Sequence, residues 1–376
     1  MLASGVTLAL TLVALAAPPL LPPGPGRLPI IVHSELGGHI FGFDIDAYGS
    51  RGVLCEAQTM PDGSVLAAVE TFDQRSGDTQ LVSVARTRDD FLALGVFAGS
   101  LGLVETEHED AQQRIQRSFT LVDPLASGRF GRKWTPPIDH DHLIERIGRS
   151  QDASLAAVYA YDNSGGFVPL IFSTDVATNT FGAPIALTDV AFSTGLMPAV
   201  AYDSALNQAV LGIQRFDRPL LAPRIALVDF GSGETTVFDG VGRGQVNGIA
   251  VDPATHKACT TTEIDYSVEF YDLDVQTGFR ETLPGAGNQF NNGADVAVDA
   301  MHGLFLVAQP NSSTAPGTSS IHVYDEDGDL IESIDGFHFS NLGNVVPMHI
   351  ALRPALRLGF VDGPDDGVTE LQAFRY

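Results

Sequence analysis

A short pattern that recurs along the chain is the strongest constraint on its fold. Residues 247–253, NGIAVDP, form an apolar strand that ends in a polar turn, and residues 294–300 and 198–204 repeat the pattern. In each copy a second strand follows at once. The residue that marks this turn recurs about every 42 to 54 positions, at Asp62, Asp110, Asp152, Asp203, Asp252, Asp299 and Arg353. A period near ~45 residues is typical of a β-propeller blade, so seven marks predict seven blades.

Each unit has room for four short strands. In residues 247–285 the pattern predicts strands at 248–251, 257–263, 267–272 and 279–283, with the last two joined by a turn at 274–278. Asp and Asn can cap their own backbone in such a turn, and Gly adopts positive φ. Long amphipathic helical patterns are absent, and 39 Gly and 22 Pro agree with a turn-dense chain. We therefore predict an all-β fold, a seven-bladed β-propeller.

The two ends of the chain are predicted to share one blade. After Arg353 only 23 residues remain, which suffice for strands at 356–361 and 369–376 but not for a fourth strand. The segment 28–46 contains two strand-like runs, at 30–33 and 39–44. One of them should pair beside 369–376 and close the ring, which removes exposed sheet edges.

The N-terminal residues have the features of a secretory signal. Residues 1–26 carry no charged side chain, and the apolar run 6–15 is followed by small residues. We expect a signal peptide at 1–16, a Pro-rich linker at 17–29 and one propeller domain at 30–376. An uncleaved membrane anchor is the alternative. The protein is then secreted or periplasmic, and the mature chain has no apolar run long enough to span a membrane.

Charge and cysteine content narrow the possible partners. With 46 acidic against 21 basic residues, the formal charge is −25, which disfavours nucleic acid and anionic membrane surfaces. The expected partner is an unidentified protein or small molecule. Cys55 and Cys259 fall on different predicted blades, so we expect two buried thiols that are not bonded to each other.

Two of the repeats resemble known propeller families. Residues 248–252 followed by 274–278, and 297–299 followed by 325–328, resemble blades of NHL-repeat proteins and YVTN-type propellers, and less closely the regucalcin/gluconolactonase-like lactonases. The likeness covers about residues 195–335. Such motifs specify blades and not chemistry. The run DEDGD at 325–329 could also be taken for a calcium loop, but it lacks the twelve-residue spacing and the closing Glu, so a hairpin is favoured.

A candidate binding site follows from the blade geometry. Loops that enter the inner strands gather around one mouth of the central channel, and they place His142, Asn247, Asn292 and His349 there. Asp141 or Asp295 could add a carboxylate. In the run DHDH at 139–142, an extended backbone would place the two His side chains on the same side, where they could supply half of the ligands of a metal site. The alternative is that this run is a solvated polar turn. His349 could equally be a core histidine.

The lactonase resemblance gives Asn247 a more specific role. In that family an Asn-Gly pair begins an inner strand, and the Asn binds a divalent ion, so the resemblance implies Ca²⁺ or another divalent metal at Asn247-Gly248. This chain departs from the family in the next blade, where Ala294 occupies the acidic position and Asp295 follows it. The family's N-terminal Glu and second Asn have no match.

Function is less constrained than fold. The chain has no nucleophile elbow, no phosphate-binding loop and no zincin motif. The sole Trp, Trp134, is interpreted as an outer-strand packing residue. The sequence favours a binding or scaffold propeller that requires no cofactor, and whether it is an enzyme is left open. The alternative is a divalent-metal-dependent lactonase or esterase-like hydrolase with its site at the channel mouth.

Overall fold

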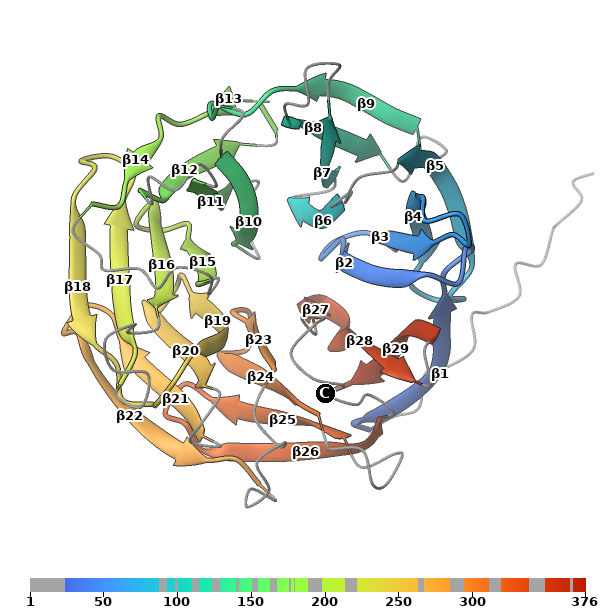
Figure 1. The fold of residues 1–376 in the computed structure, drawn as a ribbon. Coiled ribbons are helices and arrows are strands. Elements are labelled where there is room, and N and C mark those ends of the chain that lie inside the picture. The colour runs from blue at the N-terminus through green and yellow to red at the C-terminus, as the bar shows by residue number, and fades with distance from the viewer. Residues whose placement is uncertain are drawn as a thin grey trace, which may run out of the picture.

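The chain folds as a ring of β-sheets around a central axis (Figure 1). The structure, a computed structural model, describes residues 24–87, 93–98, 101–109, 115–123, 129–139, 142–150, 155–162, 168–175, 177–178, 180–188, 198–213, 222–262, 267–284, 294–310, 319–337, 349–365 and 368–376. Within these residues the only helix is a three-residue 3-10 turn, Pro354–Leu356. The predicted all-β propeller is confirmed.

Six sheets are each built from consecutive strands. Blade 1 comprises β2 (His39–Ile45), β3 (Arg51–Thr59), β4 (Val65–Asp73) and β5 (Thr79–Thr87). Blade 2 comprises β6 (Ala93–Ala98), β7 (Leu101–Glu109), β8 (Ile115–Asp123) and β9 (Arg129–Trp134). Blade 3 comprises β10 (His142–Arg149), β11 (Leu155–Asp162), β12 (Leu170–Asp175), β13 (Thr180–Phe181) and β14 (Ile185–Ala186).

The remaining consecutive blades follow the same order. Blade 4 comprises β15 (Ala199–Asp203), β16 (Gln208–Ile213), β17 (Arg224–Asp229) and β18 (Thr235–Asp239). Blade 5 comprises β19 (Val246–Asp252), β20 (Lys257–Thr262), β21 (Ser267–Asp272) and β22 (Thr277–Thr282). Blade 6 comprises β23 (Asp295–Asp299), β24 (Leu304–Gln309), β25 (Ser319–Asp325) and β26 (Leu330–Phe337).

A seventh sheet, here called the closing blade, joins the two ends of the described chain. Its order is β1 (Gly26–His33), β29 (Val368–Arg375), β28 (Leu358–Asp365) and β27 (Ile350–Arg353), with β27 innermost. β1 pairs antiparallel with β29, and Val32 lies opposite Leu371. The predicted closure by an N-terminal strand is therefore confirmed. The strand begins at Gly26, inside the segment expected to be linker.

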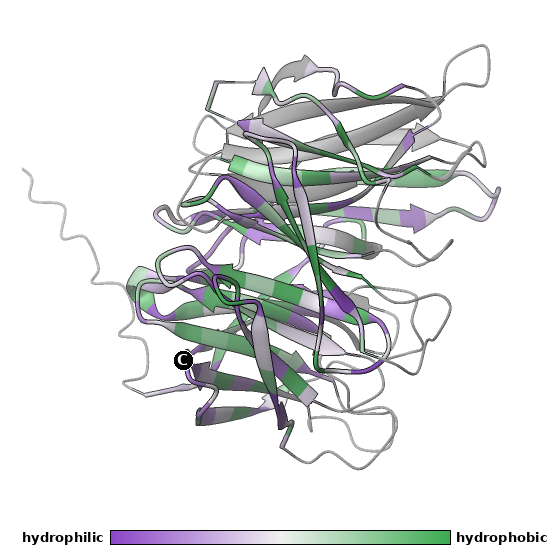
Figure 2. Ribbon diagram, turned by 90° about the vertical axis from the view of Figure 1, so that its left-hand side faces the viewer, coloured by the Kyte–Doolittle hydropathy of each residue, from purple (hydrophilic) through white to green (hydrophobic). Residues whose placement is uncertain are grey.

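The inner strands follow one another around the axis. Each contacts the next in the cyclic order β27, β2, β6, β10, β15, β19, β23 and back to β27. Hydrophobic residues are concentrated within the strands (Figure 2). The buried clusters lie between neighbouring blades; for example, Phe72 of blade 1 meets Phe360 of the closing blade, and Phe270 of blade 5 meets Phe305 of blade 6. Side-chain packing between faces of adjacent sheets thus holds the ring together.

Aspartate caps explain why the turns could be predicted. At the outer hairpins Asp229 Oδ1 accepts from the Gly231 and Ser232 N–H groups, and Gly233 has φ 77°. In the DEDGD run, Asp325 Oδ1 accepts the N–H groups of Asp327 and Asp329 at 3.0 and 2.9 Å. This carboxylate therefore closes a hairpin, as the sequence favoured.

The first turn mark was assigned to the wrong strand. The inner strand of blade 1 is β2, and its turn begins at Asp46, whereas Asp62 lies between β3 and β4. Asp62 Oδ1 accepts the Ser64 N–H at 3.1 Å, as Asp46 accepts the Tyr48 N–H at 2.8 Å. The same cap occurs at two turns of one blade, so the cap alone cannot identify which turn it marks. Asp110 and Asp152 lie outside the described residues.

The two cysteines agree with the blade assignment. Cys55 lies on β3 and Cys259 on β20, both buried, and no disulfide joins them. The sole tryptophan, Trp134, ends β9 and packs beside Phe181 with ring centroids 5.7 Å apart, which fits an outer-strand packing role.

Candidate functional site in the axial cavity

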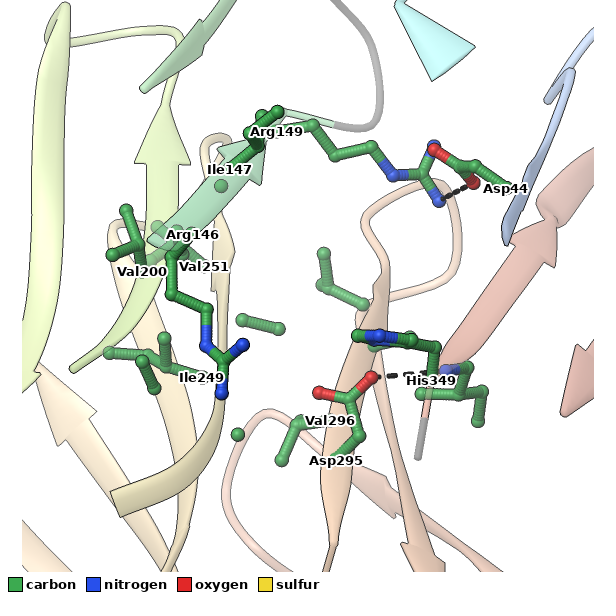
Figure 3. Close-up of a pocket in the computed structure, with 18 of the residues that line it drawn as sticks. Asp44, Arg146, Ile147, Arg149, Val200, Ile249, Val251, Asp295, Val296 and His349 are labelled. Atoms are coloured by element: carbon green, nitrogen blue, oxygen red, sulfur yellow. Dashed lines mark hydrogen bonds and ion pairs between the residues drawn. The ribbon is translucent and has the colours of Figure 1, made fainter. Parts of the chain in front are cut away.

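An axial cavity of about 190 Å³ lies between the inner strands. Six of these strands or the residues just before them contribute to its wall, which is mostly Val, Ile, Ala and Gly. A few polar side chains interrupt this apolar surface. They are Asn247 and the five labelled in Figure 3, Asp44, Arg146, Arg149, Asp295 and His349. A concave apolar surface with a few convergent polar groups is the usual form of a ligand site.

Strand β10 sends two guanidinium groups into the cavity in different directions. Arg149 pairs with Asp44 of β2, with Nη2 2.6 Å from Oδ1. The carboxylate of Asp44 is almost fully buried and also accepts the Ile45 N–H at 2.7 Å. This ion pair reaches from blade 3 to blade 1 and fixes one side of the cavity, with its charges balanced.

The second guanidinium, that of Arg146, extends across the cavity toward Asp295 of blade 6 (Figure 3). Asp295 Oδ2 accepts the Ile350 N–H at 3.0 Å. Burial raises the pKa of Asp295 to about 7, although backbone hydrogen bonds from Ile350 and Val296 and the charges of Arg146 and Arg149 act in the opposite direction.

A second carboxyl group lies behind His349. The His349 N–H donates to Asp362 Oδ1 at 2.6 Å, and the Asp362 N–H donates to the His349 carbonyl at 3.3 Å. Burial raises the pKa of Asp362 well above its usual range, and the charge of Asp295 adds to this shift. Among the described residues, Asp362 Oδ2 has no hydrogen-bond partner. Through these two hydrogen bonds, Asp362 fixes the backbone of His349, the residue that precedes β27.

A β-bulge places Asn247 at the cavity. Opposite β20 the register shifts between Val246 and Gly248, so Asn247 is the extra residue. A Cβ on Gly248 would lie 2.6 Å from the Asp295 Cα, so the glycine lets β19 approach β23 closely. The Asn-Gly pair thus has a packing reason that is independent of any ion.

The predicted site residues are brought together only in part. Asn247, Asp295 and His349 line the same cavity. His142 does not line it: its Nδ1 lies 2.6 Å from Asp139 Oδ1 at the start of β10. Asn292 and Asp141 lie outside the described residues. Within the described ranges, no three His, Cys, Asp or Glu side chains form a group that could hold a metal ion.

Sequence reasoning missed the charged side chains that come from within the strands. Arg146, Arg149 and Asp44 are mid-strand or end-strand residues, not loop residues. The available signal was the pair of arginines three positions apart in the strand 142–149, in a chain with few basic residues.

Comparison with known proteins does not assign this chain to a family. The chain matches no protein-family model and no curated protein sequence. Across the described ranges, no helix has the length and hydropathy of a membrane span. The resemblance to NHL-type, YVTN-type and lactonase propellers remains a resemblance of repeat sequence.

Proposed function

We propose that the protein is a binding protein whose small ligand occupies the axial cavity. The observation that carries this proposal is the convergence of Arg146, Asn247, Asp295 and His349, from four blades, on one apolar-walled cavity. The cavity volume of about 190 Å³ is below the range of about 300–1,000 Å³ typical of drug-sized ligands. The expected ligand is therefore a small polar molecule or ion.

Filling the cavity tests this proposal. Val200 of β15 lines the cavity and is partly exposed to it, so Val200→Trp should place an indole in the ligand's space. Thermal unfolding with and without a panel of small solutes would show which ones stabilise the wild type, because a ligand that binds the native state raises its stability. The stabilisation should vanish in the variant.

A matched substitution on the surface is the control. Val275 lies in the β21–β22 turn with 63% of its surface exposed, so Val275→Trp adds the same ring away from the cavity. It should retain every ligand response of the wild type. If Val200→Trp and Val275→Trp behave alike toward a stabilising solute, the axial cavity is not the binding site.

A divalent-metal-dependent lactonase or esterase-like hydrolase is the second candidate. The observation in its favour is that Asn247 and His349 line the cavity together with Asp295. A divalent ion there would polarise a substrate carbonyl. The guanidinium of Arg146 opposes this candidate by electrostatic repulsion. Stabilisation by Ca²⁺ or Zn²⁺ that EDTA reverses and Asn247→Ala abolishes, together with lactone hydrolysis, would establish it.

Export of the protein is part of the proposal. The apolar run and small residues before position 17 support a signal peptide at 1–16 and a secreted or periplasmic location. The intact mass of protein recovered from the producing cells tests this: cleavage after Ala16 gives a mature chain that begins at Ala17, and an unshortened chain supports the anchor alternative.

A further inference from the structure

Three consecutive blades expose a large apolar side chain at the turn that follows the inner strand. These side chains are Met301 of blade 6, Leu356 of the closing blade and Tyr48 of blade 1. The three blades are neighbours around the ring (Figure 1), and their inner strands contact one another in that order. Because blades are related by rotation about the axis, the three turns lie at the same end of the ring. We call these three side chains the apolar arc.

An arginine occupies the middle of this end of the ring. At the end of the inner strand, Arg353 stands in the closing blade where four other blades have Asp46, Asp203, Asp252 and Asp299. Its side chain does not cap its own turn. Instead, Nη2 of Arg353 donates to the Tyr48 carbonyl at 3.2 Å and Nη1 donates to Gln74 Oε1 at 3.3 Å, both in blade 1. The guanidinium therefore joins the closing blade to the turn that exposes Tyr48.

Two further arginines, Arg75 and Arg357, are exposed beside the arc. Arg357 directly follows Leu356, and Arg75 directly follows Gln74. Partial burial lowers the pKa of Arg353; the charge of Asp46 opposes this shift and the charge of Arg75 adds to it, so Arg75 lies nearby. Within the described ranges, none of the three arginines forms an ion pair with a carboxylate.

The carboxyl groups of these turns are engaged by the turns themselves. Asp46 and Asp299 are buried; Asp46 accepts the Tyr48 N–H at 2.8 Å, and Asp299 accepts the Tyr376 O–H at 3.0 Å. In the outer hairpin of blade 1, Asp73 accepts the Arg75 N–H at 2.8 Å, and the exposed Asp78 accepts the hydroxyl of Ser76 at 2.7 Å. The two exposed guanidinium groups thus keep their N–H donors available to a carboxylate from outside the chain.

This combination of side chains has the composition of a protein-binding surface. Tyr, Met and Arg are enriched at protein interfaces, and Tyr and Arg often contribute most of the binding free energy. The fork of a guanidinium matches the two oxygens of a carboxylate. A nucleic acid also carries anionic oxygens, but a long polyanion would be repelled by the remaining surface of a chain with formal charge −25. A short acidic segment interacts locally, within a Debye length of about 8 Å.

We propose that the apolar arc and its arginines form a docking surface for an acidic segment of a partner protein. Carboxylates of the segment pair with the two exposed arginines, and its apolar side chains cover the arc. Arg353 acts as a positioning residue, because it holds the backbone of Tyr48. This surface is separate from the axial cavity, so the inference does not depend on the proposed function.

Selection from a random peptide library displayed on phage, against the immobilised full chain, tests the chemistry of the partner. The enriched peptides should carry a net negative charge and at least two large apolar residues. Enrichment of basic or uncharged peptides would overturn the proposal, and so would a selection that enriches none.

Reversing the two exposed charges tests the arginines. Arg75→Glu with Arg357→Glu should weaken the Kd of an enriched peptide at least tenfold, measured by fluorescence anisotropy at ~0.15 M salt. Arg224→Glu with Arg280→Glu makes the same change of net charge on blades 4 and 5, and this control should bind nearly as tightly as the wild type. Equal losses from the two pairs would show that net charge and not the arc determines binding. If the reversed pair does not fold, Arg75→Gln with Arg357→Gln replaces it.

Shortening the apolar side chains tests the arc itself. Tyr48→Ser with Leu356→Ser should also weaken binding of the selected peptide at least tenfold. Val275→Ser with Leu330→Ser removes two equally exposed apolar side chains from the outer hairpins of blades 5 and 6 and should leave the Kd unchanged. Because all four positions are exposed, both variants should melt like the wild type. Unchanged binding by the first pair would overturn the proposal.

Two other occupants give distinguishable results. If the full chain forms a dimer in size-exclusion chromatography that Arg75→Glu with Arg357→Glu abolishes, the occupant is a second copy. If a single-stranded oligonucleotide binds and the same variant abolishes its binding, the occupant is a nucleic acid. Either result would overturn the assignment to an acidic protein segment.

Discussion

Blades 1 and 5 bury a glutamate at the same position and satisfy it in opposite ways. Glu70 on β4 and Glu269 on β21 each lie three residues before the aspartate that caps the outer hairpin, and both are fully buried. They face Leu54 and Thr260 on the second strand of their blades. The residue two positions further along that strand is Glu56 in blade 1 and Thr262 in blade 5.

In blade 5 the carboxylate is surrounded by hydroxyl donors. Thr260 Oγ1 donates to Glu269 Oε2 at 2.7 Å, and Thr262 and Ser267 donate to Oε1 at 2.9 and 2.5 Å. Three O–H donors therefore converge on the two oxygens of this buried carboxyl group. The group is satisfied by hydroxyls and not by a second carboxyl group.

In blade 1 the neighbour is a second carboxyl group. Glu70 accepts the Glu35 N–H with both oxygens, at 2.9 and 3.1 Å, and Glu56 accepts the Leu36 and Gly38 N–H groups. Burial, the side-chain hydrogen bond with Glu56 and its charge raise the pKa of Glu70 to about 9. Glu70 therefore keeps its proton at neutral pH, and the pair holds the loop that leads into β2.

The comparison leads us to expect that the second-strand neighbour, together with burial, sets the protonation state of this position, a hypothesis here called the neighbour rule. Blade 6 has a base at the same position, on which the rule can be tested. His322 also lies three residues before its capping aspartate, and its Nε2 lies 2.5 Å from Oε1 of Gln309, the residue equivalent to Glu56 and Thr262. Burial lowers the pKa of His322 to about 4, so the imidazole is neutral.

The largest expected effect is an alkaline loss of stability that originates in blade 1. The pKa of Glu70 is about 9 in the folded protein and ordinarily 4.5, so between these two pH values only the folded state keeps the proton. The free energy of unfolding must therefore fall as pH rises through this window, and the part of the fall above pH 6 is on the order of 4 kcal/mol. Urea unfolding at pH 6 and pH 10 measures the loss.

Glu70→Gln isolates the contribution of this group. The amide keeps the shape and cannot ionise, so the variant should lose much less stability between pH 6 and pH 10 than the wild type. Glu281→Gln, on the exposed outer strand of blade 5, should retain the full alkaline loss. Equal pH dependence in wild type and Glu70→Gln would contradict the assigned proton.

A smaller effect is expected from removing the blade 5 acceptor. Glu269→Leu leaves the Thr260, Thr262 and Ser267 hydroxyls in a buried site without their acceptor, which should cost about 3 kcal/mol. Guanidinium unfolding at pH 7 measures the cost. The triple change with Val at both threonines and Ala at Ser267 should recover part of the loss, since no donors then remain unsatisfied. A stable Glu269→Leu would show that the hydroxyls find other acceptors.

The propeller was predictable because its turns carry local signals. Asp229 and Asp325 cap their hairpins through their own backbone, and these caps depend on one side chain and a few following N–H groups. The local character of these signals also explains why Asp62 was assigned to the wrong turn. A capping aspartate indicates that a turn is present but not which two strands of the blade the turn connects.

Of the residues that line the cavity, only those at the beginnings of inner strands could be predicted from the sequence. Asn247 is the second residue of β19 and His349 directly precedes β27, so the order of the inner strands brings them together. Arg146 could not be placed, because the register of β10 shifts between Ile144 and Arg146, and a bulge breaks the alternation from which side-chain direction is inferred. The shift between Ile40 and Gly42 has the same consequence for Asp44 on β2.

The smallest effect, and the sharpest test of the neighbour rule, is expected at Gln309 of blade 6. Gln309→Glu places a carboxylate against His322 Nε2, which favours the imidazolium and should raise the pKa of His322 from about 4 by at least one unit. A histidine with a lowered folded pKa makes the protein less stable as pH falls from 6.5 toward 4, so the variant should lose about 1 kcal/mol less than the wild type over that range. Nuclear magnetic resonance titration of the imidazole protons measures the pKa directly. Ser333→Ala, which removes the other hydrogen bond of the ring from an exposed position, is the control and should move the pKa far less. If Gln309→Glu leaves the imidazole neutral down to pH 4, burial and not the second-strand neighbour sets the protonation state of this position.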